Sequence, residues 1–156
     1  SVVNIGDSRA LFVHAPKFLR GVRHVTRLSV DHKPDVESER RRIVAAGGFV
    51  EGHRVNGTLG VSRSLGDFFL HPIVISEPHF RTFPYPDDAA EHADLHWLVL
   101  GCDGVFDELW DERVGQLLQD DEHGLSTPRL KAERLRDAAY ILNSDDNISV
   151  VLLQYV

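Results

Sequence analysis

Four aspartates of this chain stand where their side chains could share a metal ion. Asp7, Asp103 and Asp146 each lie just beyond one end of an apolar segment. Asp107 follows Asp103 by four residues. If these segments are strands that end at one edge of a sheet, the carboxylates converge, and like charges that close stay ionised only when a cation joins them. Magnesium and manganese suit carboxylate-only sites. Spacing alone supports such a metal site and a set of separate turn or cap aspartates about equally.

The residues around Asp103 exclude two chemistries that use a covalent intermediate. A cysteine nucleophile that transfers phosphate needs Arg six positions later, but position 108 is Glu, so Cys102 is expected in the core. An aspartyl nucleophile of the haloacid dehalogenase type needs the motif Asp-x-Asp-Gly. In this chain Gly101 occupies the position of the first Asp, so the nucleophile is absent. His92 and His96 have the spacing of zinc ligands, but no further ligand accompanies them, and we expect both on the surface in a polar loop.

Composition is typical of one globular domain. The chain has 156 residues, 42% of them hydrophobic and 26% charged, which is enough for a sizeable core. Its single cysteine rules out an internal disulfide and favours an intracellular location, cytoplasmic or nuclear. No apolar run approaches the roughly 20 residues of a membrane-spanning helix. The arginines of the basic first part are scattered without interleaved aromatics, so no nucleic-acid partner is expected. The chain opens in an apolar pattern and contains no Met, so we expect a piece of a longer protein.

Strands outnumber helices in the predicted order of elements. The segment before Asp7 and the segment after it are expected to form an antiparallel pair through the turn GDSR. Strands are further predicted at 25–30, 49–55, 95–103 and 147–156, the last of them buried, and extended chain is predicted at 71–85. Helices are predicted at 35–46 with Asp35 as N-cap, over a short segment capped by Asp111, and from Thr127 to about Asn143. The fold class is α+β, with antiparallel sheets and helices packed outside them.

Five blocks of the chain resemble, in order, the carboxyl-terminal part of a metal-dependent protein phosphatase of type 2C. They are VVNIGDSRALF, LSVDHKPDVESERRRIVAAGGFV, RVNGTLGVSRSLGDFFL, WLVLGCDGVFDELWD and NSDDNISVVLLQYV. The resemblance implies a sandwich of two antiparallel β-sheets flanked by helices, incomplete in this chain, with residues 1–156 as the carboxyl-terminal portion of one catalytic domain. It also implies hydrolysis of phosphoserine and phosphothreonine in phosphoprotein substrates by a metal-activated water at a two-metal centre.

The same resemblance assigns roles to particular residues. Asp103 and Asp146 match the family's core metal ligands, and Asp7 and Asp107 match positions that hold a further, looser metal. Asn147 would support Asp146. The expected cofactors are two or three magnesium or manganese ions in the complete domain.

A second group of residues matches the segment beside the family's mobile flap, which borders the substrate site. Arg63 and Asp67 are expected to anchor it. The family's Asp-Gly-His-Gly-Gly stretch, with a bridging metal ligand and the acid for the leaving group, is absent from these 156 residues, so the catalytic group stays unassigned. We therefore expect the chain alone to be inactive and to need the missing amino-terminal part of the domain. Two alternatives stay open: a pseudophosphatase or regulatory binding module with this fold, and a natural short form completed by a partner.

Overall fold

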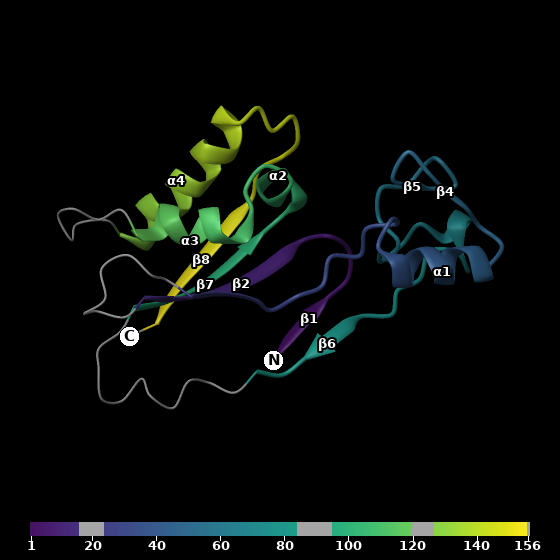
Figure 1. Ribbon diagram of the computed structural model, residues 1–156, viewed down its shortest axis with the longest axis horizontal. Coiled ribbons are helices and arrows are strands. Elements are labelled where there is room, and N and C mark those ends of the chain that lie inside the picture. Colours follow the sequence, from purple (N-terminus) through teal and green to yellow (C-terminus); the bar gives the residue numbers. More distant parts are fainter. Residues whose placement is uncertain (16–23, 84–94, 120–126, 156) are drawn as a thin grey trace. The chain divides into compact units, whose positions relative to one another are not determined.

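The computed structural model describes residues 1–15, 24–83, 95–119 and 127–155, and these form two compact units (Figure 1). The first unit comprises Ser1–Asp7 and Val30–Arg81, and the second comprises Ser8–Ser29 and Thr82–Val156. Sheets with antiparallel strands and helices outside them confirm the predicted fold class. No helix in the described ranges is long and apolar enough to cross a membrane.

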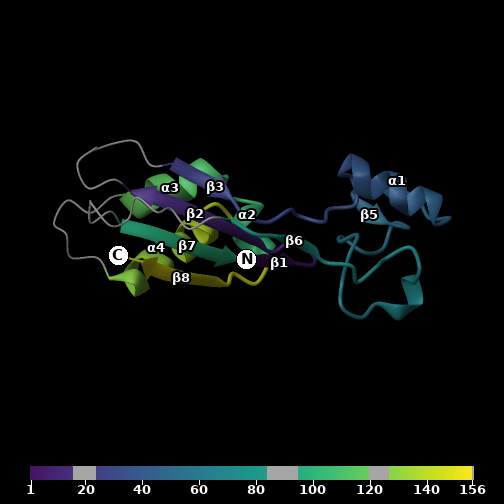
Figure 2. The ribbon, with the colours of Figure 1, turned by 90° about the horizontal axis from the view of Figure 1, so that it is seen from below.

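A four-stranded antiparallel sheet is the centre of the second unit. Its order is β3(His24–Arg27), β2(Arg9–Ala15), β7(Leu95–Gly101) and β8(Val150–Tyr155). The helices of the unit are α2(Asp103–Phe106), α3(Asp111–Gln119) and α4(Pro128–Ile141). Figure 1 shows α3 and α4 on one side of the strands, and Figure 2, seen from below, shows the strands in front of them. The sheet therefore has one face covered by helices.

Alternation along the strands divides side chains between the two faces of this sheet. Leu11, Val13, Trp97 and Val99 are fully or almost fully buried and pack with the helices. The helical side of this core is formed by Val105, Phe106, Leu109, Val114, Leu117, Leu118, Leu135 and Ala139. On the other face, Val151 and Leu153 of β8 are 53% and 44% exposed, so the prediction that this strand is buried is wrong.

The helical layer contains a buried ammonium group. Lys131 of α4 is 3% exposed, and its Nζ donates to the Leu118 carbonyl at 2.6 Å. The same Nζ lies 5.4 Å from the ring centroid of Trp97, which adds a cation–π contact. This side chain therefore links α4 to the end of α3 and to the sheet.

An arginine pair fixes the start of α3 to the sheet. Asp111 is the first residue of that helix, and its carboxylate accepts from Arg9 Nη1 at 2.7 Å and from Arg27 Nε at 2.7 Å. Burial opposes the charge of Asp111, but the hydrogen bonds and charges of Arg27 and Arg9 outweigh it and lower the pKa of the carboxyl. The prediction that Asp111 caps this helix is therefore wrong: Asp111 is the first helical residue, and its carboxylate joins the helix to β2 and β3.

The first unit is built around a smaller core. Its strands are β1(Val2–Asn4) paired with β6(His79–Arg81), and β4(Val50–Glu51) paired with β5(Arg54–Val55). Its helices are α1(Glu37–Ala45) and the 3₁₀ turn η1(Phe68–Leu70). Ile43, Val55, Leu70 and Val74 are its buried apolar residues. The end predicted for this helix at residue 46 agrees with the structure to within one residue: α1 ends at Ala45, and Gly47 follows with a φ of +86°.

Three local predictions were wrong in this unit. β1 pairs with β6 and not with β2, because the chain turns at Gly6, whose φ is 91°. Asp35 does not cap α1; its carboxylate contacts His53 Nδ1 at 3.0 Å, and the N-cap position is Val36, without a side-chain bond. The segment 49–55 is a tight hairpin rather than one strand, because Gly52 and His53 both take positive φ.

The prediction that the two histidines lie on the surface is wrong for His96. His96 lies within β7, is 1% exposed, and has its Nδ1 3.0 Å from His14 Nδ1 on the neighbouring strand. The surface loop expected for His96 is therefore wrong, whereas its place in a strand agrees with the strand predicted at 95–103. His92 lies outside the described residues.

Helix α4 provides a test of local stability. Thr127 is its N-cap, and its Oγ1 accepts from the Leu130 amide at 3.3 Å. We expect Thr127→Ala to lower the free energy of unfolding of the full-length protein by about 1 kcal/mol, because one helix amide loses its acceptor. Urea unfolding measures this difference. Thr127→Ser keeps a hydroxyl and should stay close to wild type; equal losses in both variants would contradict the capping role.

Candidate metal centre

The topology of the second unit brings the surroundings of Asp103 and Asp146 together. Strands β7 and β8 are antiparallel neighbours, and Gly101 at the end of β7 is opposite Val150 at the start of β8. Asp103 follows this pair by two residues along one strand, and Asp146 precedes it by four residues along the other. The sheet register therefore directs both aspartates to the same edge.

Hydrogen bonds hold the two segments in contact beyond the sheet. Ser144 Oγ donates to the Gly104 carbonyl at 2.7 Å. Cys102 Sγ donates to the Asn147 carbonyl at 3.0 Å and accepts from the Ser149 amide at 3.2 Å. Cys102 is partly buried and packs against the core, so the prediction of a core residue is confirmed only in part. Its thiol is thus part of the contact between the two segments.

Gly104 permits the close approach. A Cβ added at this residue would lie 2.4 Å from the Asn147 carbonyl oxygen and 3.3 Å from Asp146 Cβ. No other amino acid fits there without moving the backbone. The structure thus places Asp103 and Asp146 on facing backbone segments, and glycine is required between them.

The two carboxylates are oriented by their own chain. Asp103 Oδ1 accepts from the Gly104 amide at 2.9 Å, and Asp146 Oδ1 accepts from the Asn147 amide at 2.6 Å. Asp146 is exposed, and no Lys or Arg in the described part of the chain pairs with it. Asn147 contacts Asp146 through its backbone N–H, while its own side chain is exposed. Charge at Asp146 is therefore balanced by solvent and not by a fixed cation.

The other two predicted ligands have different surroundings. Asp107 is exposed at the C-terminal end of α2, and its amide donates to the Asp103 carbonyl at 2.8 Å, one turn away. Asp7 belongs to the first unit, and its Oδ2 lies 2.8 Å from Lys33 Nζ. Sequence reasoning did not identify this lysine as its partner. Within the described ranges, no group of three or more His, Cys, Asp or Glu side chains is arranged to hold a metal ion.

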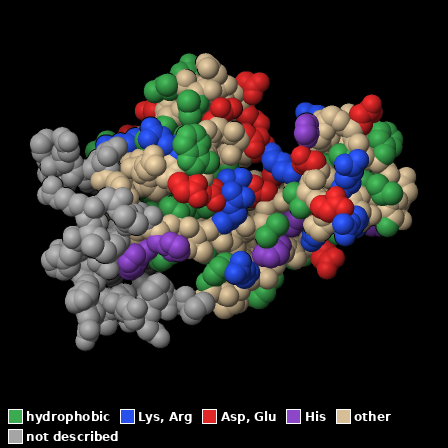
Figure 3. Space-filling model, viewed as in Figure 1, with side chains coloured by type: hydrophobic (Ala, Val, Ile, Leu, Met, Phe, Trp, Pro, Cys, Tyr) green, Lys and Arg blue, Asp and Glu red, His purple; other side chains and the backbone are tan. Residues whose placement is uncertain are grey.

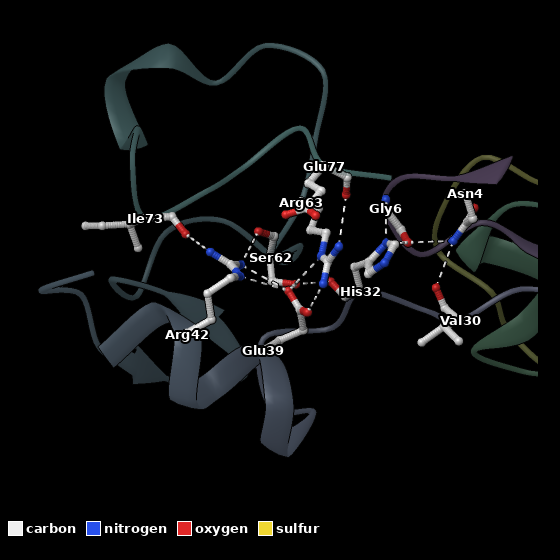
Figure 4. Close-up of polar contacts among 10 residues, drawn as sticks. All are labelled: Asn4, Gly6, Val30, His32, Glu39, Arg42, Ser62, Arg63, Ile73 and Glu77. Carbon is white, nitrogen blue, oxygen red and sulfur yellow. Dashed lines mark hydrogen bonds and ion pairs between the residues drawn. The ribbon is translucent and has the colours of Figure 1, made fainter. Parts of the chain in front are cut away.

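A buried glutamate organises the segment that contains Arg63. Glu39 of α1 is 4% exposed, and its carboxylate accepts from Ser62 Oγ at 2.7 Å, from Arg42 Nη2 at 3.0 Å and from Arg63 Nε at 3.1 Å (Figure 4). Sequence reasoning missed Glu39. A signal was available, because Glu39 and the buried Ile43 are four residues apart and so share one face of the helix.

The two arginines extend this network to the backbone of the neighbouring loop. Arg42 Nη1 donates to the Ile73 carbonyl at 2.6 Å, and Arg63 Nη1 donates to the Glu77 carbonyl at 2.9 Å (Figure 4). Asp67 has a φ of 50°, and its Oδ2 accepts from Ser64 Oγ at 2.6 Å. Arg63 therefore joins the loop to α1, while Asp67 stabilises a tight local turn.

Two opposing effects set the pKa of Glu39. Burial raises it, but hydrogen bonds from Arg63, Ser62 and Arg42 outweigh burial and lower the pKa from 4.5 to about 2. The hydrogen bond to Glu39 in turn raises the pKa of Arg63. Glu39 is therefore charged at neutral pH and fully compensated by its donors.

Comparison with known proteins identifies the family of this chain. A family model described as Protein phosphatase 2C matches residues 1–148. The chain belongs to this family.

Relatives and solved structures extend the comparison. "Probable protein phosphatase 2C 45" of Oryza sativa subsp. japonica is 36% identical and aligns with 99% of this chain and 50% of its own length. A phosphatase structure from Toxoplasma gondii is 38% identical with a TM-score of 0.76, covering 96% of this chain and 46% of that chain. The structure of a C. elegans sex determining protein is 28% identical with a TM-score of 0.77, covering 96% and 35% respectively. The chain thus spans half or less of the length of these proteins.

The Glu39 network predicts a specific pH dependence of stability. The folded-state pKa of about 2 lies below the ordinary value of 4.5, so the stabilisation is complete above pH 4.5 and is lost as the pH falls toward 2. We expect Glu39→Gln to cost roughly 3 kcal/mol at neutral pH, because two arginines lose a buried anion. The difference from wild type should shrink between pH 4.5 and pH 2 in urea unfolding of the full-length protein.

The same helix contains a matched control. Glu37 pairs with Arg41 at 2.6 Å, but the side chains are 67% and 77% exposed. Glu37→Gln should change the free energy of unfolding by less than about 1 kcal/mol. A Glu39→Gln difference that stays constant from pH 7 to pH 2 would contradict the proposed origin of the stabilisation.

Proposed function

We propose that residues 1–156 form the carboxyl-terminal portion of the catalytic domain of a metal-dependent protein serine/threonine phosphatase. Membership of the protein phosphatase 2C family supports the activity, and coverage of half or less of the relatives supports the partial domain. The observation that carries the proposal is the contact at Gly104, where the residue next to Asp103 packs against Asp146 and Asn147 so closely that no side chain fits. The substrates are phosphoserine and phosphothreonine residues of proteins.

The donor chemistry of this edge fits magnesium or manganese. Asp103 and Asp146 offer carboxylate oxygens, which are the ligands that hard divalent ions prefer. In the proposal these two residues hold the core ions, and Asp107 and Asp7 contribute to a looser one, giving two or three ions in the complete domain. Bound ions would supply an activated water and would neutralise charge on the phosphoryl oxygens. The protein's own part is to fix the two carboxylates through their adjacent amides.

The segment after α1 would border the substrate. Arg63 is held by Glu39 and by the Glu77 carbonyl, so the loop around it keeps one shape. Asp67 fixes the next turn through Ser64. In the proposal both residues act as positioning residues for this border and do not touch the phosphate.

This chain alone is expected to be inactive and to bind metal weakly. It lacks the family's Asp-Gly-His-Gly-Gly stretch, which the resemblance assigns to the bridging ligand and the acid. The missing amino-terminal part of the domain is therefore its necessary partner. We propose a cytoplasmic or nuclear location, although one relative that is 35% identical is named as mitochondrial.

Mutation of the aspartates in the complete domain tests the metal proposal. We expect Asp103→Asn and Asp146→Asn each to lower manganese-dependent hydrolysis of a phosphothreonine peptide by at least about 100-fold, because several kcal/mol of charge stabilisation is lost. Asp145→Asn is the matched control, since Asp145 is an exposed neighbour without an assigned role. Nearly unchanged activity in Asp103→Asn or Asp146→Asn would refute the site. A complete wild-type domain without turnover would favour the binding-module alternative.

The partial domain is tested separately. The purified 156-residue chain with manganese should give no hydrolysis above background, because the bridging ligand and the acid are absent. Adding the amino-terminal half of the domain as a separate polypeptide should restore measurable turnover. Ordinary enzymatic rates from the 156-residue chain alone would contradict this part of the proposal.

A further inference from the structure

The turn that precedes Asp7 is fixed to the segment before α1 by reciprocal hydrogen bonds. The His32 amide donates to the Gly6 carbonyl at 3.0 Å, and the Gly6 amide donates to His32 Nδ1 at 3.1 Å (Figure 4). Asn4 Nδ2 also donates to the Gly6 carbonyl, at 3.1 Å, and to the Val30 carbonyl at 2.9 Å. Two backbone segments of the first unit that lie 26 residues apart in the sequence are therefore held together at Gly6.

The imidazole of His32 is suited to accept this hydrogen bond. The residue is 2% exposed, and burial together with the charge of Arg63 lowers the pKa of the ring below its ordinary value of 6.5, so the ring is neutral at neutral pH. Its Nδ1 also lies 3.0 Å from the Gly6 carbonyl oxygen, but that oxygen already accepts from the His32 amide and from Asn4. A carbonyl oxygen has two lone pairs, so Nδ1 accepts from the Gly6 amide and Nε2 carries the proton.

The same segment is anchored on its other side. The Ser62 amide donates to the His32 carbonyl at 2.8 Å, and the Ser62 hydroxyl donates to the buried carboxylate of Glu39 (Figure 4). Because His32 is bonded through its amide, its carbonyl and its ring, the backbone that leads into Lys33 has little freedom to move.

The residues that follow these two anchored positions form an ion pair. Lys33 Nζ lies 2.8 Å from Asp7 Oδ2, and the two side chains are 29% and 14% exposed. Since Gly6 and His32 are bonded to each other, Asp7 and Lys33 leave the same backbone contact, and the structure keeps them within reach of one another. Among the residues that the structure describes, Lys33 is the cationic side chain that pairs with Asp7.

An ammonium group at Asp7 opposes the binding of a second cation to the same carboxylate. A divalent ion either displaces the Lys33 ammonium, and the ion pair is lost, or binds the other carboxylate oxygen beside it, and two positive charges lie close together. Both routes lower the affinity of Asp7 for a metal ion. A lysine that only oriented Asp7 for the metal would have the opposite effect, because its removal would weaken metal binding.

We propose that Lys33 is a resident counter-ion of Asp7 and determines how weakly this aspartate holds a divalent metal ion. The inference rests on the proposed function, in which Asp7 contributes to the looser ion of the complete domain. It deepens that function, because Lys33 is not one of the predicted ligands and yet sets the concentration of metal that the enzyme requires.

Manganese binding to the full-length protein tests the proposal, with free Mn²⁺ measured by electron paramagnetic resonance. We expect Lys33→Met to tighten the weakest class of sites by about fivefold, the upper range for one partly exposed ion pair, and to leave the tighter sites unchanged. Lys33→Gln, a second neutral variant, should behave in the same way. Lys33→Arg keeps the charge and should bind manganese no more tightly than wild type. Unchanged or weaker binding in both neutral variants would overturn the proposal.

Two further variants test whether the effect acts through Asp7. Asp7→Asn should weaken the weakest site, and adding Lys33→Met to Asp7→Asn should change it no further, because the carboxylate that Lys33 pairs with is gone. Several Lys and Arg side chains (blue) lie over the region of α1 in Figure 3, so general charge effects need a control. Arg40→Met is that control, since Arg40 is exposed on α1 and its loss leaves the partner of Asp7 in place. Equal tightening by Arg40→Met would overturn the proposal.

Failure of this proposal and failure of the proposed function give different results. A full-length protein that binds no manganese would overturn both. Manganese binding that Asp103→Asn and Asp146→Asn abolish, but that Lys33→Met leaves unchanged, would overturn this inference alone. In hydrolysis of the phosphothreonine peptide, Lys33→Met should also lower the half-saturating manganese concentration by about fivefold.

Discussion

The absence of a side chain at Gly104 is the constraint on which the candidate site depends. Adjacent antiparallel strands bring the end of β7 and the approach to β8 to one edge, but register alone does not set how close the following segments come. The Cys102 thiol and the Ser144 hydroxyl close that distance with hydrogen bonds to backbone groups. The residue next to Asp103 then packs against Asp146 and Asn147, so two acidic residues belong to neighbouring segments at one edge of the sheet.

The two acidic centres of the chain differ in how their charge is balanced. Glu39 is almost fully buried and accepts from two arginines and a serine, so its charge is compensated within the protein and serves to fix a loop. Asp146 is exposed and is oriented by a single adjacent amide. Buried charge with fixed partners is typical of a structural network, whereas an exposed carboxylate at a strand edge remains available to an external ligand.

Much of the fold could be predicted because its signals are local. Thr127 followed by Pro128 identified the start of α4, and the apolar runs identified β2, β7 and β8. Predictions failed where a distant residue decides the outcome. β1 pairs with β6, which is more than 70 residues away, and Asp7 pairs with Lys33. The edge shared by Asp103 and Asp146 could be anticipated from the strand ends. The required contact at Gly104 could not, because no periodic pattern in the sequence indicates that two loops approach each other.

The buried ammonium of Lys131 has a practical consequence for studying this protein. Its Nζ is enclosed between the Leu118 carbonyl and the Trp97 ring, so an amine-acylating reagent reaches it only when α4 separates from α3. The Nζ of Lys33 pairs with Asp7, but its side chain is 29% exposed, so the reagent reaches it more readily than it reaches Lys131. Mass spectrometry of the peptide that contains Lys131 would thus measure the rate at which the helical layer opens. Acylation of Lys33 is the internal control for the activity of the reagent.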